Sequence, residues 1–148
     1  SSSTRRAMAD HCQVDFYVLT RPTQSPGELA CVLAMMAWEQ GPRVFVRTEG
    51  EDEARALDQQ MWDLPPGRFL PHGLEEDDAP VCIAERAKGI AENRDLVINL
   101  CTEAVPDPER FRRLLEIVPA DSDQRTASRE KFKTYRDRGL SPETHQMT

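Results

Sequence analysis

Apolar runs and helix-forming segments alternate along most of this chain. Residues 14–19 form a β-branched and aromatic run that stops at Arg21-Pro22, a pattern that predicts a strand. Ser25-Pro26 then supplies a helix N-cap with proline at the first helical position. Apolar residues recur at helical spacing from there until Gly41-Pro42. This part of the sequence therefore predicts one strand followed by one helix.

A second strand–helix pair follows directly. Residues 43–47 predict a strand, and residues 49–62 predict a helix whose first turn is rich in acidic side chains, the charge that the helix dipole favours there. Short apolar stretches lie at 68–70, 81–84 and 96–100, separated by polar or acidic loops. This alternation predicts a single three-layer α/β domain, with a mainly parallel sheet flanked by helices.

The C-terminal third is predicted to contain two more helices. Residues 108–117 have apolar positions at helical spacing, which predicts a short helix. The last helix is predicted to begin after a cap at Asp121 or Ser122 and to stop at Gly139. Residues 140–148 are then expected to be loose or docked on the surface.

The two ends of the chain are set apart from this domain. Residues 1–9 begin with a serine run and include a possible initiator, Met8, so we interpret them as a cloning remnant and a disordered start. The domain is predicted to span 10–139, with 140–148 as a tail. The longest apolar run, about residues 29–38, is far shorter than the roughly 20 residues that cross a bilayer, and no signal peptide is evident. We therefore expect a cytoplasmic protein.

Charge is distributed unevenly along the sequence. The formal net charge is −7, yet residues 110–138 hold nine basic side chains against five acidic ones. Residues 1–109 hold ten basic against twenty acidic side chains. A chain that is acidic overall repels nucleic acid at long range, so little direct DNA binding is expected. A local basic helix suits an acidic peptide or protein partner better.

Motifs for nucleotide, metal and nucleophile chemistry are missing. Neither G-x-x-x-x-G-K-[ST] nor G-x-G-x-x-G occurs, and residues 20–25, after the first predicted strand, contain no glycine that would let the backbone approach a phosphate. The four cysteines lack C-x-x-C spacing, and three lie in apolar segments typical of buried reduced thiols. We predict no catalytic residue, cofactor or metal. The alternative left open is a small α/β enzyme for an acidic or phosphorylated substrate, with His72 as its residue to test.

The last predicted helix carries a basic face with one aromatic residue in it. At about 100° per residue, four positions fall within a stripe about 60° wide. These positions hold Arg125, Arg129, Phe132 and Arg136. One interpretation is a solvated helix that turns Phe132 inward. The other is a pocket for an acidic peptide with a terminal aromatic residue, in which an arginine binds a carboxylate while Phe132 and Val118 hold the ring.

A third interpretation of the same helix is direct binding of single-stranded DNA. Residues 125–138 would supply the positive charge, and Phe132 and Tyr135 would serve as stacking platforms for bases. The acidic balance of the whole chain argues against this interpretation.

Five stretches carry a family resemblance. They are, in order, Phe16-Tyr17-Val18-Leu19; Arg43-Val44 through Ala56-Leu57-Asp58 to Trp62; Phe69-Leu70-Pro71-His72; Asp95-Leu96-Val97-Ile98-Asn99-Leu100; and Val118-Pro119 through Arg129-Glu130-Lys131-Phe132-Lys133 to Tyr135-Arg136. Through these stretches the sequence resembles, over residues 15–139, the chi subunit family of bacterial DNA polymerase III. It implies a Rossmann-like fold without a nucleotide-binding glycine loop. It also implies a non-catalytic replication adaptor in the clamp-loader assembly.

The resemblance implies two partners. One is the acidic C-terminal tail of single-stranded DNA-binding protein, which ends in an aromatic residue. Its implied site comprises Val118, Arg125, Arg129, Phe132, Tyr135 and Arg136. The other partner is the psi subunit of the clamp loader, and in some bacteria a repair helicase, through a face that contains Trp62 and Phe69.

Two positions depart from the family pattern in this implied site. Arg125 and Phe132 stand where the family pattern has a lysine and a tyrosine, so the charge and the ring are kept. At the other implied interface, Phe69 could equally be a core residue.

A surface shaped for a different protein gives no reason for self-association, so we expect the isolated protein to be a monomer.

Overall fold

The computed structural model describes residues 12–63, 72–74, 80–86 and 94–147. The predicted disordered start and Phe69 lie outside these ranges. Within them the chain forms seven strands, three α-helices and one turn of 3-10 helix. In chain order these are β1 (Gln13–Leu19), α2 (Pro26–Glu39), β2 (Val44–Thr48), α3 (Glu51–Trp62), β3 (His72–Leu74), β4 (Val81–Glu85), β5 (Leu96–Asn99), η2 (Pro108–Arg110), β6 (Arg113–Val118), α4 (Ser122–Asp137) and β7 (Glu143–Met147).

The strands form one sheet in the order β3-β4-β2-β5-β6-β1-β7. Every neighbouring pair is parallel. Parallel strands need crossover connections, and α2, α3 and α4 supply helical ones. This confirms the predicted α/β domain with a parallel sheet. None of the helices in the described ranges has the length and apolar character needed to cross a bilayer.

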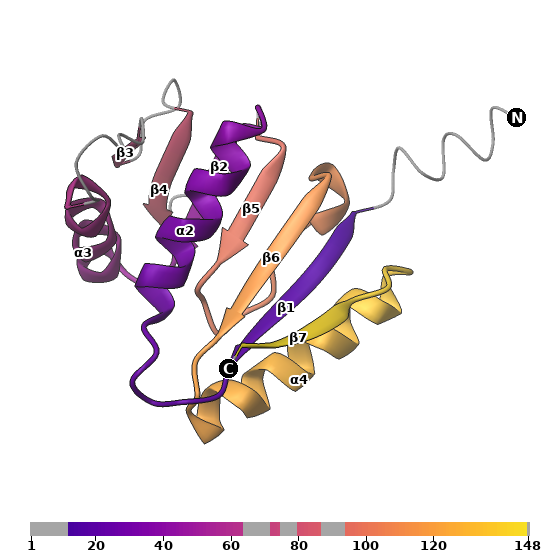
Figure 1. Cartoon of the computed structure of the whole chain (residues 1–148). Coiled ribbons are helices and arrows are strands. Elements are labelled where there is room, and N and C mark those ends of the chain that lie inside the picture. Colours follow the sequence, from indigo (N-terminus) through magenta and orange to yellow (C-terminus); the bar gives the residue numbers. More distant parts are fainter. Residues whose placement is uncertain (1–11, 64–71, 75–79, 87–93, 148) are drawn as a thin grey trace, which may run out of the picture.

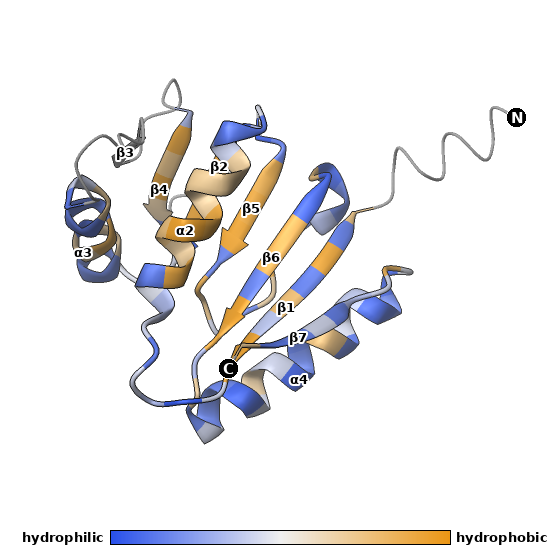
Figure 2. Ribbon diagram, in the orientation of Figure 1, coloured by the Kyte–Doolittle hydropathy of each residue, from blue (hydrophilic) through white to orange (hydrophobic). Residues whose placement is uncertain are grey.

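Helices cover both faces of the sheet, which gives three layers (Figure 1). Successive strand side chains point to opposite faces. In β2, Val44 and Val46 pack with residues of α2 and α3 on one face. Phe45 lies in the other apolar cluster, with Tyr135 of α4. Figure 2 shows β4 and β5 as mainly hydrophobic, and β7 and α4 as mainly hydrophilic.

The predicted helix boundaries of the first and last helices are confirmed. The Ser25 hydroxyl accepts a hydrogen bond from the Glu28 N–H at the start of α2. The Asp121 carboxylate caps α4 by accepting from the Asp123 N–H at 3.2 Å. Gly139 follows α4 with φ of +90°, a conformation that glycine adopts without strain.

The predicted helix at residues 108–117 is wrong. Only Pro108–Arg110 is helical, as a single 3-10 turn, and residues 113–118 form β6 in the interior of the sheet. The last five residues of β6 are buried because both faces of the sheet are covered. A strand buried on both faces lacks the alternation that marks a surface strand, so the apolar spacing there imitated a helix.

The predicted tail contains a seventh strand. Residues 143–147 form β7, which pairs in parallel with β1 at the end of the sheet. Leu140, between α4 and β7, is buried in the apolar cluster beneath α4. The tail is therefore docked, and it extends the sheet by one strand.

Three polar side chains cross the middle of the sheet on the face under α4. Arg47 of β2, Asn99 of β5 and Glu116 of β6 are register partners on neighbouring strands, and all three are buried. An Arg47 guanidinium N–H donates to the Asn99 side-chain oxygen at 3.2 Å. The Asn99 amide donates to the Glu116 carboxylate at 2.8 Å.

Helix α4 is attached to this polar row by two side chains one turn apart. Lys131 Nζ lies 2.7 Å from one Glu116 carboxylate oxygen and donates to the Cys101 carbonyl at 2.8 Å. The Tyr135 hydroxyl donates to the other Glu116 oxygen and accepts from the Val105 N–H at 2.8 Å. Burial raises the pKa of Glu116, and the charge of Lys131 with these donors opposes that rise.

Removing Lys131 should be strongly destabilising because it leaves the Glu116 carboxylate buried and unpaired. We expect Lys131→Met to lower the free energy of unfolding by about 3–5 kcal/mol. Lys133→Met makes the same chemical change at an exposed site and should cost no more than about 0.5 kcal/mol. Urea denaturation measures both. Equal losses for the two variants would show that the buried pair is not needed to hold α4.

Candidate functional site on helix α4

The attachment of α4 leaves its basic side facing solvent. Arg125, Arg129 and Arg136 are exposed, whereas Lys131 and Tyr135 point into the core. None of the three arginines forms an ion pair with a residue in the described ranges. Free guanidinium groups on one side of a helix offer hydrogen bonds to carboxylates or phosphates.

A hollow of about 230 Å³ lies where α4 passes the edge of the sheet. Its walls come from three elements. Arg125, Ser128 and Arg129 belong to α4, Val18 belongs to β1, and Gln146 belongs to β7. Val18 and Gln146 are register partners on their strands. Among the residues that the structure describes, no acidic side chain lines this hollow, so its chemistry suits an anionic group.

Phe132, Phe16 and Val118 form an aromatic and aliphatic floor under the following part of α4. Phe132 is half-buried, and its ring centroid lies 5.5 Å from that of Phe16 in β1. Val118 belongs to the same apolar cluster but is 1% exposed, so it supports the surface from below. Tyr135 is fully buried, and its hydroxyl is engaged with Glu116.

The sequence-predicted residues thus fall into two groups. The structure brings Arg125, Arg129 and Phe132 to one accessible side of α4, and Arg136 is exposed on the same helix. It places Val118 and Tyr135 beneath that side. Three residues of the hollow were missed: Val18, Ser128 and Gln146. Val18 and Ser128 lie in elements that were predicted, but their contact depends on tertiary packing. Gln146 lies after Gly139, where no apolar alternation marks a strand.

Strand β7 is held against β1 by polar and aromatic contacts. His145 Nε2 lies 2.9 Å from an Asp15 carboxylate oxygen, and its ring stacks on Tyr17 with centroids 5.1 Å apart. The Gln24 side-chain amide donates to the Met147 carbonyl at 2.9 Å. These contacts fix the strand that carries Gln146 into the hollow.

Asp15 is the charged centre of that attachment. Its other carboxylate oxygen accepts from Arg113 Nη2 at 2.8 Å. Burial would raise the pKa of Asp15, but the hydrogen bonds from His145 and Arg113 and the Arg113 charge outweigh it, so the pKa lies below its ordinary value.

Two other features of the surface lie away from α4. Trp62, at the end of α3, is 56% exposed, which fits the predicted surface anchor.

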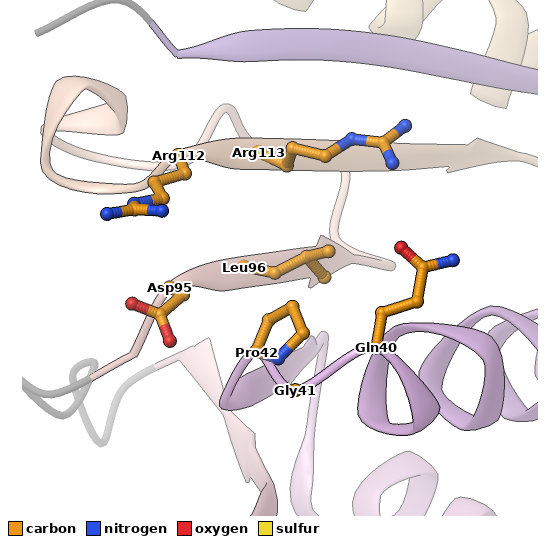
Figure 3. A pocket seen from close by; sticks show the side chains of 7 residues that line it. All are labelled: Gln40, Gly41, Pro42, Asp95, Leu96, Arg112 and Arg113. Atoms are coloured by element: carbon orange, nitrogen blue, oxygen red, sulfur yellow. The ribbon is translucent and has the colours of Figure 1, made fainter. Parts of the chain in front are cut away.

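A hollow of about 520 Å³ lies between the end of α2 and the starts of β5 and β6, at the opposite end of the sheet from Val18. Figure 3 shows Asp95 and Arg112 at one side of it and Gln40 and Arg113 at the other. This hollow presents both signs of charge and contains no sequence-predicted site residue.

The carboxyl ends of β2 and β5 are where folds of this type bind phosphates. Here a hollow of about 310 Å³ at this edge is lined by Glu49 and Glu53. Glu49 already accepts hydrogen bonds from the Thr102 N–H and hydroxyl. Carboxylates at this position do not fit a phosphate group.

The cysteines offer no activated nucleophile. Cys12, Cys31, Cys82 and Cys101 are buried and form no disulfide in the described ranges, which confirms the prediction of buried reduced thiols for the last three. Burial raises the pKa of Cys31 to about 11 and the pKa of Cys101 to about 12, so these thiols stay protonated at neutral pH. In the described ranges, no group of His, Cys, Asp and Glu side chains is arranged to hold a metal ion.

These features define a Rossmann-like α/β domain that presents a basic helix, α4, to solvent. Its sequence contains neither of the glycine-rich phosphate-binding motifs. Residues 12–143 match the sequence model of the family described as DNA polymerase III chi subunit, HolC, and the chain belongs to this family. The family places it in DNA replication as an accessory subunit of DNA polymerase III.

Similar proteins agree with this assignment. The DNA polymerase III subunit chi of Pseudomonas aeruginosa is 36% identical over 142 residues, which cover 91% of this chain and 96% of that protein. The Haemophilus influenzae subunit is 32% identical over 137 residues, with 89% and 95% covered. The Escherichia coli subunit is 32% identical over 138 residues, with 87% and 94% covered.

The fold is also similar to that of a solved structure with a different sequence. A structure of S. cerevisiae Dbp5 bound to RNA and ADP BeF3 superposes with a TM-score of 0.63 at 13% identity. The match covers 93% of this chain and 42% of that chain. It shows the fold alone.

The attachment of β7 should depend on pH through Asp15. The folded pKa of Asp15 is depressed, so its stabilising contribution is present above the unfolded value of about 3.9 and is lost as pH falls through the folded pKa. We expect Asp15→Asn to lower the Tm at pH 5–6 and the difference from the wild type to shrink below about pH 4. Thermal unfolding followed by circular dichroism measures this.

The control is Asp137→Asn, which alters an exposed aspartate at the end of α4. Its effect on the Tm should be small at every pH. A Tm difference for Asp15→Asn that stays constant down to pH 2.5 would contradict the assigned role of its charge.

Proposed function

We propose that this protein is a non-catalytic adaptor that binds the acidic C-terminal tail of single-stranded DNA-binding protein and links it, through the psi subunit, to the polymerase III clamp loader. The observation that carries the proposal is the pair formed by Arg125 and Arg129. These side chains lie one helical turn apart, form no ion pair within the described ranges and line a hollow without acids. Phe132, three residues after Arg129 on the same helix, adds a half-buried aromatic ring that packs on Phe16.

The chemistry of an acidic tail fits these groups. An arginine guanidinium can bind a carboxylate through two parallel hydrogen bonds. An aromatic residue at the end of the tail would bury apolar area against the exposed part of Phe132, a ring already supported by Phe16. Arg136, farther along the same side of α4, would meet additional acids of the tail.

The two alternatives have less support from the described residues. Tyr135 is buried, so single-stranded DNA binding would retain only Phe132 as a stacking platform. An enzyme acting on a phosphorylated substrate would need donors where Glu49 and Glu53 present acceptors. His72, the residue to test for that alternative, lies in β3.

The link to the clamp loader is proposed to use the surface around Trp62, which also serves a repair helicase where one is present. Trp62 is one of three large hydrophobic side chains that are exposed in the described ranges; the others are Val32 and Met36 of α2. Tryptophan is enriched among residues that dominate binding energy. In this role the protein works in the cytoplasm and is monomeric when isolated.

Arg129→Ala should weaken binding of a peptide that copies the last residues of the cognate single-stranded DNA-binding protein. Loss of one charge-assisted hydrogen bond predicts a decrease of about 1.5–3 kcal/mol in binding free energy. Arg55→Ala on α3 removes the same charge from another part of the surface and should leave the affinity within about 0.5 kcal/mol of the wild type. Calorimetric titration at low and moderate salt measures both.

Three results would contradict this assignment. Unchanged affinity for Arg129→Ala would move the site elsewhere. Equal losses for both arginine variants would reduce the effect to overall charge. Tighter binding of a single-stranded oligonucleotide than of the peptide, with a steep salt dependence, would favour the DNA-binding alternative.

Trp62→Ala should separate the two proposed interfaces. We expect it to weaken binding to psi by about 2 kcal/mol or more, with no effect on tail binding. Val32→Ala truncates another exposed apolar residue and serves as the matched control. Surface plasmon resonance with immobilised psi measures both variants. Wild-type affinity for psi in Trp62→Ala would place that interface elsewhere.

A further inference from the structure

We propose that the bound tail forms an additional strand along the free edge of β7, with alternate side chains facing the arginines of α4. This inference rests on the proposed function and specifies the geometry of the same site. It names the partner as an extended acidic peptide and assigns backbone hydrogen bonds of β7 to its recognition.

The edge of the sheet next to α4 is available for such pairing. β7 is the last strand in the sheet order, and within the described part of the chain it pairs with β1 alone. Alternate residues of an edge strand turn their N–H and C=O groups away from the sheet, and extended peptides bind to such edges. Figure 1 shows β7 at the border of the sheet with α4 running beside it.

Side chains of β7 follow the same path as the basic side of α4. Gln146 lines the hollow with Arg125 and Arg129. Two residues earlier, Thr144 is the register partner of Phe16, whose ring contacts Phe132. A strand added next to β7 would therefore pass the arginines at one point and Phe132 at another.

The distance between the arginines and Phe132 along α4 agrees with the distance between alternate residues of a strand. The midpoint between Arg125 and Arg129 lies five residues from Phe132, which is about 7.5 Å along the helix axis. Residues i and i+2 of a strand point to the same face and lie about 7 Å apart. An acid at one position of the peptide and an aromatic residue two positions away can then meet the arginines and Phe132 together.

Charge selects an acidic peptide for this edge. Arg125 and Arg129 lack ion-pair partners in the described ranges, and the remaining walls of the hollow are Val18, Ser128 and Gln146, which carry no charge. Only every second side chain of an added strand faces α4, so acids at alternate positions contribute to binding and those between them do not.

The decisive experiment is a backbone N-methyl scan of the tail peptide, titrated by calorimetry into the full chain. Methylating an amide that donates to β7 removes a hydrogen bond, so alternate positions should weaken binding by about tenfold and the intervening ones by less than about twofold. Replacing acids one by one with their amides should show the same period of two. The peptide carries every change, so the fold of the protein is not disturbed.

The outcomes separate this inference from the proposed function. A peptide that binds, loses affinity with Arg129→Ala and tolerates N-methylation everywhere would overturn strand addition and leave the α4 site standing. A peptide that does not bind in low salt would overturn both.

Hydrogen exchange followed by NMR provides an independent measurement. On peptide binding, the exposed amides of β7 should exchange about tenfold more slowly, whereas those of β3, at the other edge of the same sheet, should not change. Protection of β7 that rises with protein concentration in the absence of peptide would assign the edge to a second copy of the chain and overturn the proposal.

Discussion

The buried contact between Lys131 and Glu116 determines how α4 sits on the sheet. Buried ion pairs contribute little net stability, but a broken pair is strongly unfavourable, so an arrangement of α4 that separated Lys131 from Glu116 would be disfavoured. Lys131 and Tyr135 both bind Glu116, which fixes the rotation of the helix about its axis. At about 100° per residue, Arg125, Arg129 and Arg136 then lie roughly 100–140° around the helix from that buried side. The direction of the basic face is thus a consequence of a contact in the core.

The polar row of Arg47, Asn99 and Glu116 is connected to the candidate site through β6, β1 and β7. Glu116 is the register partner of Phe16, and Phe16 in turn contacts Phe132 and pairs with Thr144 of β7. The core contact, the aromatic floor and the edge strand therefore occupy one line across the sheet. Asp15 holds β7 from the opposite face, so the hollow depends on contacts from both sides of β1.

Sequence patterns predicted the helices and strands whose local composition and capping residues agree with their place in the tertiary structure. The strand at 14–19 and the helix after Ser25-Pro26 follow ordinary rules of composition and capping. The pattern failed at β6, where burial of both faces removes the alternation, and at β7, whose residues are mostly polar. It located Arg125, Arg129 and Phe132 because helical periodicity is independent of tertiary contacts. It could not separate Lys131 from the exposed basic residues, because only its contact with Glu116, fifteen positions earlier in the chain, makes it a core residue.

The position of the candidate site also follows from the charges at the carboxyl ends of the strands. Glu49 and Glu53 occupy the carboxyl ends of β2 and β5, where related folds bind phosphates, so anionic ligands are disfavoured there. A similar fold in the Dbp5 structure therefore carries no information about binding by this chain. On α4, beside a strand that ends the sheet, three arginines have no ion-pair partner in the described ranges. An acidic partner bound there, as proposed, would meet side chains of α4 oriented by the core contact at Glu116 and backbone groups of a strand held by Asp15.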